Sequence, residues 1–112
     1  MQLTNIGELF ISRILQLHDT AHVKIAIGKP KKFPDGKDYY CPYQIIGLGD
    51  EKVNWGGGID EIQALLLTLE QIGIILNNSE EYKQGNLSWI GSEDGNLGFP
   101  HHDSSRMLKH LI

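Results

Sequence analysis

The clearest pattern of apolar and polar positions along the chain is a helical one that runs from about Ile59 to Leu76. Apolar residues recur there at spacings of three and four, which places them on one side of an α-helix. Because Leu67 and Ile74 lie off that stripe, the helix is expected to be apolar around much of its circumference and largely buried across a sheet. The stripe consists of Ile62, Leu65, Leu66, Leu69, Ile72, Gly73 and Leu76.

Polar residues mark both ends of this helix. Asp60 and Glu61 fall in its first turn, where carboxylates complement the positive end of the helix dipole. Asn77 and Asn78 are expected to end it. Gly73 costs helix stability, roughly 1 kcal/mol relative to alanine, and a close approach to a strand would explain its presence.

Alternation with a period of two predicts a β-hairpin near the start of the chain. In Leu9–Leu17 the odd-numbered positions are apolar except for Arg13, and Val23–Ile27 alternates more regularly. Helical spacing also occurs in Leu9–Leu17, but its β-branched and aromatic content favours a strand. His18–Thr20 forms the polar turn between the two strands.

Further strands are predicted at Tyr39–Leu48, at Val53–Trp55 and at Leu87–Ile90. Pro42 cannot donate a hydrogen bond to a neighbouring strand, so its strand is expected at a sheet edge or with a bulge there. Gly56–Gly58 is expected to form a tight turn into the helix.

Together these elements predict an α+β fold. An antiparallel meander of four to five strands carries one long helix on one face, since two packed layers suffice for a domain of this length. Glu80–Asn86 is expected to be a polar loop, and Arg106–Leu111 a short C-terminal helix. Residues 1–112 would form a single domain, with a core at about residues 8–100 and a tail or short helix at 101–112.

Composition and charge narrow the classes of partner. Apolar residues make up 40% of the chain and the net charge is −4, which suits a globular protein and not a nucleic-acid-binding one, because phosphate binding usually requires a basic patch. We expect no membrane partner and a cytoplasmic location, since no span-length apolar stretch and no signal peptide are evident. Lys29, Lys31, Lys32 and Lys37 form the only local basic cluster, and Asp35 and Asp38 dilute it.

The residues that could carry chemistry favour structural roles. Gly56–Gly58 matches neither the dinucleotide nor the P-loop pattern, and the carboxylates that follow would repel phosphate. The lone Cys41 excludes an intrachain disulfide and has no adjacent base. His101, His102 and His110 lack the ligand spacing of zinc sites. We therefore expect no catalytic, cofactor-binding or metal-binding residues.

Paired carboxylates are the feature that points to a partner. They occur as Asp50-Glu51, Asp60-Glu61, Glu80-Glu81 and Glu93-Asp94, all in turns or at a helix start. An acidic surface of this kind can steer a basic protein partner. The predicted partner-binding residues, which include nearby aromatic residues, are Asp50, Glu51, Trp55, Glu80, Glu81, Tyr82, Glu93 and Asp94.

A series of short motifs resembles a known family. In order they are Gly28-x-Pro30, Tyr40-Cys41-Pro42-Tyr43-x-Ile45-x-Gly47-x-Gly49, Gly58-x-Asp60-x-x-Gln63-Ala64-Leu65, Ile72-Gly73, Leu87-x-Trp89 and Gly98-Phe99-Pro100. This pattern is similar to a family of small, often stand-alone bacterial domains of unknown function, over Val23 to Pro100. The resemblance implies one compact α+β domain and brings no activity or catalytic residues.

Two functional hypotheses follow. The first is a non-enzymatic binding protein, an immunity protein that neutralises a cognate, basic toxin domain; it rests on protein type and not on a motif. The second is a small enzyme or ligand-binding domain with a pocket near Cys41 and the Gly56–Gly58 turn. The chain is expected to be a monomer or a weak homodimer that pairs through an exposed edge strand.

Overall fold

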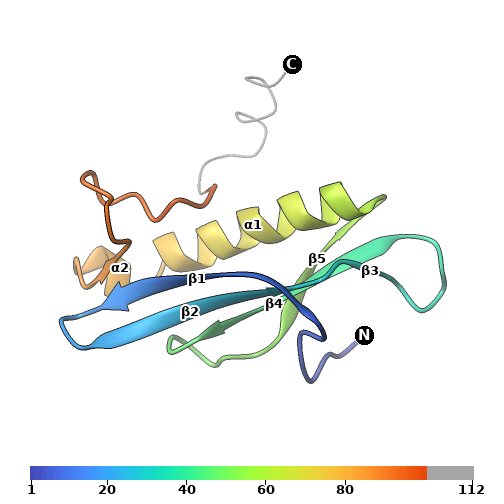
Figure 1. Cartoon of the computed structure of the whole chain (residues 1–112), viewed down its shortest axis with the longest axis horizontal. Helices are drawn as coiled ribbons and strands as arrows, with labels where there is room; N and C mark the ends of the chain where they lie inside the picture. Colours follow the sequence, from blue (N-terminus) through green and yellow to red (C-terminus); the bar gives the residue numbers. More distant parts are fainter. Residues whose placement is uncertain (101–112) are drawn as a thin grey trace, which may run out of the picture.

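The structure, a computed structural model, describes residues 1–100 of the chain (Figure 1). The predicted hairpin, the third strand and the long helix are all present, and the chain has the predicted α+β fold. The elements are β1 (Leu9–Leu17), β2 (Ala21–Gly28), β3 (Lys31–Lys32), β4 (Tyr39–Ile46), β5 (Asn54–Gly58), α1 (Glu61–Asn77), α2 (Glu80–Lys83) and β6 (Leu87–Ser88).

The strands form one antiparallel sheet. β1 pairs with β2, β2 with β4, and β4 with β5, so the main path is a meander, while β6 returns to pair with the other side of β1. β5 pairs with β4 from Tyr39 to Tyr43. Since β2 and β3 also pair with residues in that range, both must lie on the opposite side of β4, and β3 continues the line of β2.

Pro42 lies in an interior strand, so the prediction of an edge position is wrong. The bulge, the other alternative, lies in the partner strand. Between the pairs Ile27↔Tyr43 and Lys31↔Tyr40, three residues of the β2–β3 side oppose two residues of β4. The extra residue falls in the stretch opposite Cys41 and Pro42, and Pro42 has no N–H to donate to a regular ladder.

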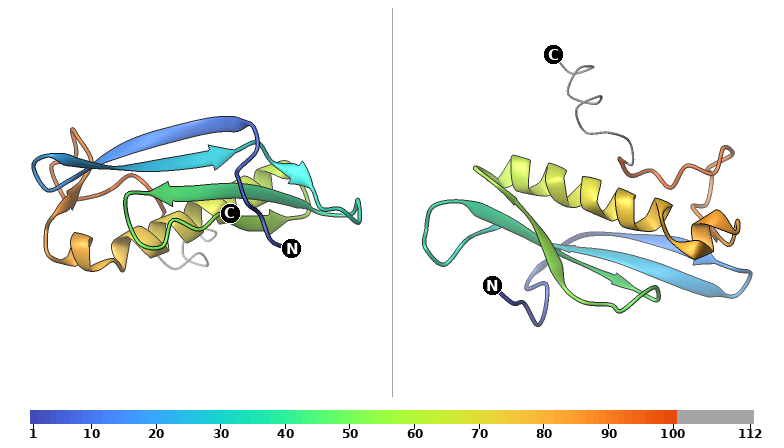
Figure 2. Two further views of the ribbon diagram at one scale, coloured as in Figure 1. Left: turned by 90° about the horizontal axis from the view of Figure 1, so that it is seen from below. Right: turned by 180° about the vertical axis from the view of Figure 1, so that it is seen from behind.

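α1 lies across one face of the sheet, over β4 and β5 (Figure 1, Figure 2). That face carries the alternating apolar residues of β2 and β4, which are buried as their period of two predicts. The segment from β6 to Pro100 covers the part of the same face that belongs to β1. The core consists of Leu15, Val23, Ile25, Ile27, Cys41, Tyr43, Ile45, Leu48, Ala64, Ile72, Leu76, Leu87, Leu97 and Phe99.

α1 begins two residues later than predicted and is less buried. Asp60 is its N-cap, and the Asp60 carboxylate accepts a hydrogen bond from the backbone N–H of Gln63 at 2.8 Å, which satisfies one of the first free N–H groups of the helix. Only one face is buried, so the expectation of a largely buried helix is wrong: Ile62 and Leu66 on the predicted stripe are mostly exposed. The buried helix residues are Ala64, Thr68, Ile72, Gly73 and Leu76.

The glycines before the helix form the end of β5 and not a turn, which corrects the prediction for Gly56–Gly58. Their lack of side chains lets α1 approach the strand closely. A Cβ atom on Gly56 would lie 2.6 Å from the backbone nitrogen of Thr68, and one on Gly58 would lie 2.5 Å from that of Ala64. The seam between α1 and β5 is therefore built from small residues on both sides.

Gly73 is also explained by a close approach, but not to a strand. A Cβ atom there would overlap the backbone carbonyl of Pro100, so the chain crosses α1 at this position. The prediction of a strand contact is therefore wrong, because the segment after β6 occupies that place.

Three smaller differences concern the ends of the sheet. The predicted loop Glu80–Asn86 contains the short helix α2, and the predicted strand Leu87–Ile90 is reduced to Leu87–Ser88. In β1, Leu9 and Ile11 are exposed although their alternation predicted a buried face.

The predicted helix at Arg106–Leu111 and the three C-terminal histidines lie outside the described residues. Within residues 1–100, none of the helices is long and apolar enough to cross a membrane.

Candidate functional site

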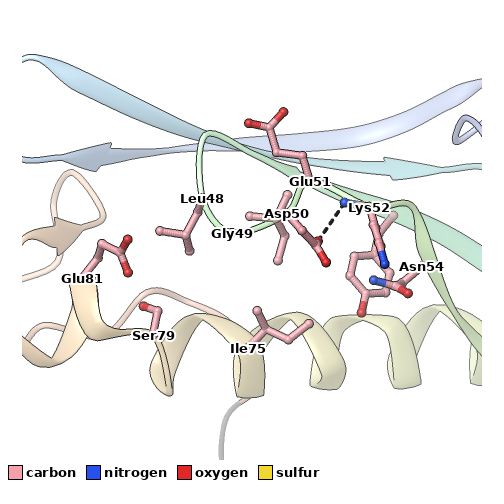
Figure 3. Close-up of a pocket in the computed structure, with 11 residues that line it drawn as sticks. Leu48, Gly49, Asp50, Glu51, Lys52, Asn54, Ile75, Ser79 and Glu81 are labelled. Carbon is pink, nitrogen blue, oxygen red and sulfur yellow. Dashed lines mark hydrogen bonds between the residues drawn. The ribbon is translucent and has the colours of Figure 1, made fainter.

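A pocket of about 290 Å³ opens between the β4–β5 loop and the C-terminal part of α1 (Figure 3). α2 lies beside the C-terminal end of α1, at one end of the molecule (Figure 1), and Glu81 of α2 lines the pocket. Three segments that are distant in sequence contribute to it: the end of β4 with the following loop, the last turns of α1, and α2. Its lining residues are Tyr43, Ile45, Leu48, Gly49, Asp50, Glu51, Lys52, Asn54, Ile75, Ser79 and Glu81.

The inner wall of the pocket is apolar. Tyr43 and Ile45 come from β4, on the face that α1 covers, and Leu48 and Ile75 complete the wall. The Tyr43 hydroxyl donates a hydrogen bond to Oε1 of Gln71 at 3.0 Å. Burial raises the pKa of Tyr43, so the phenol stays neutral and serves as an apolar surface with a fixed polar tip.

The loop that forms one rim is held by its own side chains. Oδ1 of Asp50 accepts a hydrogen bond from the backbone N–H of Lys52 at 3.0 Å, and Oε2 of Glu51 accepts one from that of Gly47 at 3.2 Å. Glu51 has a φ of 57°, which a tight turn requires here. Asp50 is directed toward α1, whereas the side chain of Glu51 is directed to the other side of the loop (Figure 3).

The opposite rim carries Glu81, which α2 positions. The N-cap of α2 is Ser79, whose hydroxyl oxygen accepts a hydrogen bond from the backbone N–H of Tyr82 at 3.2 Å. The Ser79 hydroxyl also donates to the Leu76 carbonyl at 2.7 Å, so the end of α1 and the start of α2 are joined. As a result the Glu81 carboxylate points toward the pocket from the side opposite Asp50 (Figure 3).

The structure brings together some of the predicted partner-binding residues and separates others. Asp50, Glu51 and Glu81 line the same pocket, with Glu51 turned away from it. Glu80 is exposed on α2. Trp55 pairs with Pro42 on the face of the sheet away from α1 and, together with Glu51, lines a second pocket beside the N-terminal residues.

Tyr82, Glu93 and Asp94 belong to a separate group of contacts around the loop after β6. The Tyr82 hydroxyl donates to the Gly95 carbonyl at 2.9 Å, and Tyr82 packs against the core. Hydrogen bonds from the backbone N–H of Asn96 and from the Ser92 hydroxyl lower the pKa of Asp94. Tyr82 and Asp94 therefore hold this loop, and Glu93 remains as an exposed carboxylate.

The sequence prediction missed the apolar wall of the pocket. Alternation in β4 does place Tyr43 and Ile45 on one face, and this signal could have indicated the wall. Ile75 lies beside Leu76 at the end of the helix, and no local pattern links it to the acidic loop more than twenty positions earlier. Their proximity comes from the way α1 crosses the sheet.

The space around Cys41 is filled. Cys41 is fully buried and its S–H donates to the Gly28 carbonyl at 3.5 Å. Burial raises the pKa of the Cys41 thiol, which disfavours the reactive thiolate. α1 packs directly on Gly56 and Gly58. A pocket at this place, as the second hypothesis requires, would therefore have to displace the helix.

A family model for a domain of unknown function, DUF6968, matches residues 11–101. The chain belongs to the DUF6968 family. The predicted resemblance to domains of unknown function is thus confirmed, and the DUF6968 match extends into β1, beyond the motifs that carried the resemblance. The matched region, residues 11–101, includes nearly all of the sheet, both helices and the residues that line the pocket. The searches among curated proteins and among solved structures gave no match.

Proposed function

We propose that this DUF6968 domain is a non-enzymatic binding protein of the immunity type, which neutralises a cognate toxin domain in the cytoplasm. The observation that carries the proposal is the pocket with an apolar wall and carboxylates on facing rims, Asp50 and Glu81. The net charge of −4 supports a basic partner, since complementary charge steers association and favours the correct partner.

The pocket suits a lysine or arginine side chain of that partner. Such side chains place their aliphatic stem against apolar surface and keep the charged head near acceptors. Here Tyr43, Leu48 and Ile75 would contact the stem, and Asp50 and Glu81 would accept hydrogen bonds from the head. Lys52 also lines the pocket. The partner's cation would therefore either displace the Lys52 side chain or bind beside it.

The buried thiol of Cys41 and the buried phenol of Tyr43 support a binding role over a catalytic one. Cys41 is the one cysteine in the chain, and it is buried and protonated. The other group whose pKa burial raises, Tyr43, is held by Gln71. Neither residue combines exposure, a lowered pKa and an adjacent base, the combination that nucleophilic catalysis requires.

The test is co-expression with the toxin domain encoded by the neighbouring gene, followed by titration calorimetry of the purified pair. The double variant Asp50→Asn/Glu81→Gln removes two charges, while the amide oxygen introduced at position 50 still accepts a hydrogen bond from the Lys52 N–H. We expect it to weaken binding at least about ten-fold, because charged pairs in a desolvated pocket contribute strongly.

Asp35→Asn/Asp38→Asn is the matched control, since it removes two charges from exposed positions outside the pocket. It should leave the affinity within about two-fold, because exposed rim charges contribute little to binding. Absence of a complex with the wild-type protein, or of relief from toxicity, would contradict the proposed function. Equal effects of the two changes would contradict the role of the pocket.

A further inference from the structure

The outer side of β1 is an uncovered strand edge. β6 pairs only with Gln16 and Leu17, and among residues 1–100 no other strand pairs with that side of β1. β1 is the outermost strand along most of this side of the sheet (Figure 2, left). The edge from Leu9 to Leu15 thus presents backbone groups to the solvent, and such edges pair readily with another strand.

The pairing pattern shows which backbone groups face outward. His18 donates to the Asn86 carbonyl at 2.8 Å, on the side of β6. Alternate residues of an antiparallel strand direct their N–H and C=O groups to opposite sides, and β1 pairs with β2 without interruption from Ile11 to Leu17. The N–H and C=O groups of Ser12 and Ile14 therefore point to the free edge.

The side chains along this edge are unusually apolar. Leu9 and Phe10 are each 50% exposed, Ile11 is 44% exposed and Ile14 is 48% exposed. Monomeric proteins commonly protect an edge strand with lysine, proline, a β-bulge or an inward-pointing charge. β1 contains neither lysine nor proline, and its bulge, between Leu9 and Ile11, leaves Ile11–Leu17 in regular register.

The single charged residue of β1 points inward, but its charge already has partners within the fold. The Arg13 guanidinium lies 4.0 Å from the centre of the Trp89 ring and 4.8 Å from that of Phe99. It also donates to the carbonyls of Leu97 and Gly98 at 3.2 and 3.0 Å. Its charge is therefore directed onto the segment that follows β6, and not toward an approaching strand.

We propose that a second copy of this chain pairs with the edge, β1 against β1 in antiparallel orientation about a two-fold axis at Ser12. A strand edge is complementary to itself in this arrangement, and two-fold dimers are the commonest oligomers. Centring on Ser12 brings Ile14 of one copy next to Phe10 of the other, which lies in the bulge between Leu9 and Ile11, so an aromatic residue comes beside a β-branched one. A centre at Arg13 would instead place Ile14 opposite Ser12.

The area available sets the strength of this dimer. Half of a large apolar side chain is on the order of 80 Å², so four such side chains on each copy bury roughly 600 Å² in total. Together with the backbone hydrogen bonds this falls in the range of weak, reversible interfaces. The dissociation constant is expected in the micromolar range, about 10–100 μM.

Sedimentation equilibrium on the full chain tests the proposal, and Ile14→Glu and Ile46→Glu form a matched pair. Both residues are on the face away from α1, and both pair with Lys24, from opposite sides. Only Ile14 lies at the free edge. We expect Ile14→Glu to raise the dissociation constant at least ten-fold and Ile46→Glu to leave it unchanged, with both variants folded by circular dichroism.

A cross-link provides a second readout in case Ile14→Glu does not fold. Ser12→Cys should form a disulfide-linked dimer under mild oxidation, since Cys41 is buried and the two introduced thiols would face each other across the axis. Thr20→Cys, exposed in the β1–β2 turn far from the axis, should not.

Three outcomes would overturn the proposal. A wild-type chain that stays monomeric up to about 1 mM would contradict pairing of two copies. Equal weakening by Ile14→Glu and Ile46→Glu, or equal cross-linking of the two cysteine variants, would also contradict pairing through β1. None of these results bears on the pocket, which lies between the β4–β5 loop and the helices.

Discussion

The β5 side and the β1 side of the sheet differ in how far the rest of the chain covers them. At β5, glycines allow α1 to lie directly on the strand, and the Thr68 hydroxyl bridges two strands there. At β1, apolar side chains remain about half exposed and the strand edge is free. The comparison suggests that one side stabilises the fold whereas the other is available for contacts. Substitutions at the two sides should therefore have different consequences.

The largest effect is expected at the seam between α1 and β5. In Gly56→Ala the new Cβ would meet the Thr68 backbone nitrogen at 2.6 Å, so the helix must move away, at a cost of about 3 kcal/mol in the free energy of unfolding. Urea denaturation followed by tryptophan fluorescence measures this change.

Gly57→Ala is the control within the same strand. Its Cβ would point to the other face, where the nearest atom belongs to Phe33 at 3.7 Å, an ordinary contact. The free energy of unfolding should change by less than about 1 kcal/mol. Similar losses at Gly56 and Gly57 would show that the seam is not tightly packed.

The next effect concerns the hydroxyl that joins helix and sheet. Thr68 accepts a hydrogen bond from the Gly56 N–H at 2.9 Å and donates one to the Cys41 carbonyl at 2.8 Å, and it is fully buried. Thr68→Val keeps the shape but leaves both backbone groups without this partner, which should cost about 2 kcal/mol in the free energy of unfolding. Thr68→Ser retains the hydroxyl and should be the less destabilising change in the same denaturation assay.

A smaller and more local effect is expected where β1 contacts the segment after β6. Arg13→Met removes the hydrogen bonds to Leu97 and Gly98 and the cation–π contacts, at a cost of about 1–2 kcal/mol. Hydrogen exchange should become faster in residues 89–99 before it changes in β2 or β4. If protection fell equally throughout the sheet, Arg13 would be part of the global core. Arg13→Lys keeps the charge, so its loss of stability should lie between those of the wild type and Arg13→Met.

The smallest effect should come from the exposed loop after β6. Hydrogen bonds from Asn96 and Ser92 lower the pKa of Asp94 below its ordinary value of 3.8. A lowered pKa in the folded state contributes stability above the unfolded pKa, and this contribution disappears as the pH falls through the folded pKa. Asp94→Asn should thus lower the melting temperature slightly at pH 7 and not at all near pH 2. If the difference in melting temperature between Asp94→Asn and the wild type grew as the pH fell, this prediction would be contradicted.

Local patterns predicted the elements and failed where two distant segments meet. The period of 3.6 located α1 to within two residues at its start, and alternation located the hairpin, because both signals depend on neighbours a few positions apart. The same periodicity overestimated the burial of Ile62 and Leu66, since an apolar stripe does not say how much of it another layer covers. It also could not assign the partner of Gly73, which comes from a segment more than twenty residues later.

The candidate site was likewise predictable from the sequence only in part. Its carboxylates were found as pairs in turns, but only the folded chain decides that Asp50 and Glu81 face one pocket while Glu51 and Trp55 point elsewhere. The apolar wall was missed because Tyr43 and Ile75 meet across two layers.

By itself the sequence determined an α+β domain with one long helix, an acidic surface and membership of a family of unknown function. The tertiary structure alone decided that α1 covers one face of β5, that the β1 edge stays free, and that the acidic β4–β5 loop and α2 share a pocket. The physical reason is range: helix and strand periodicity arises from local backbone geometry, whereas burial and pockets depend on which faces the chain brings together.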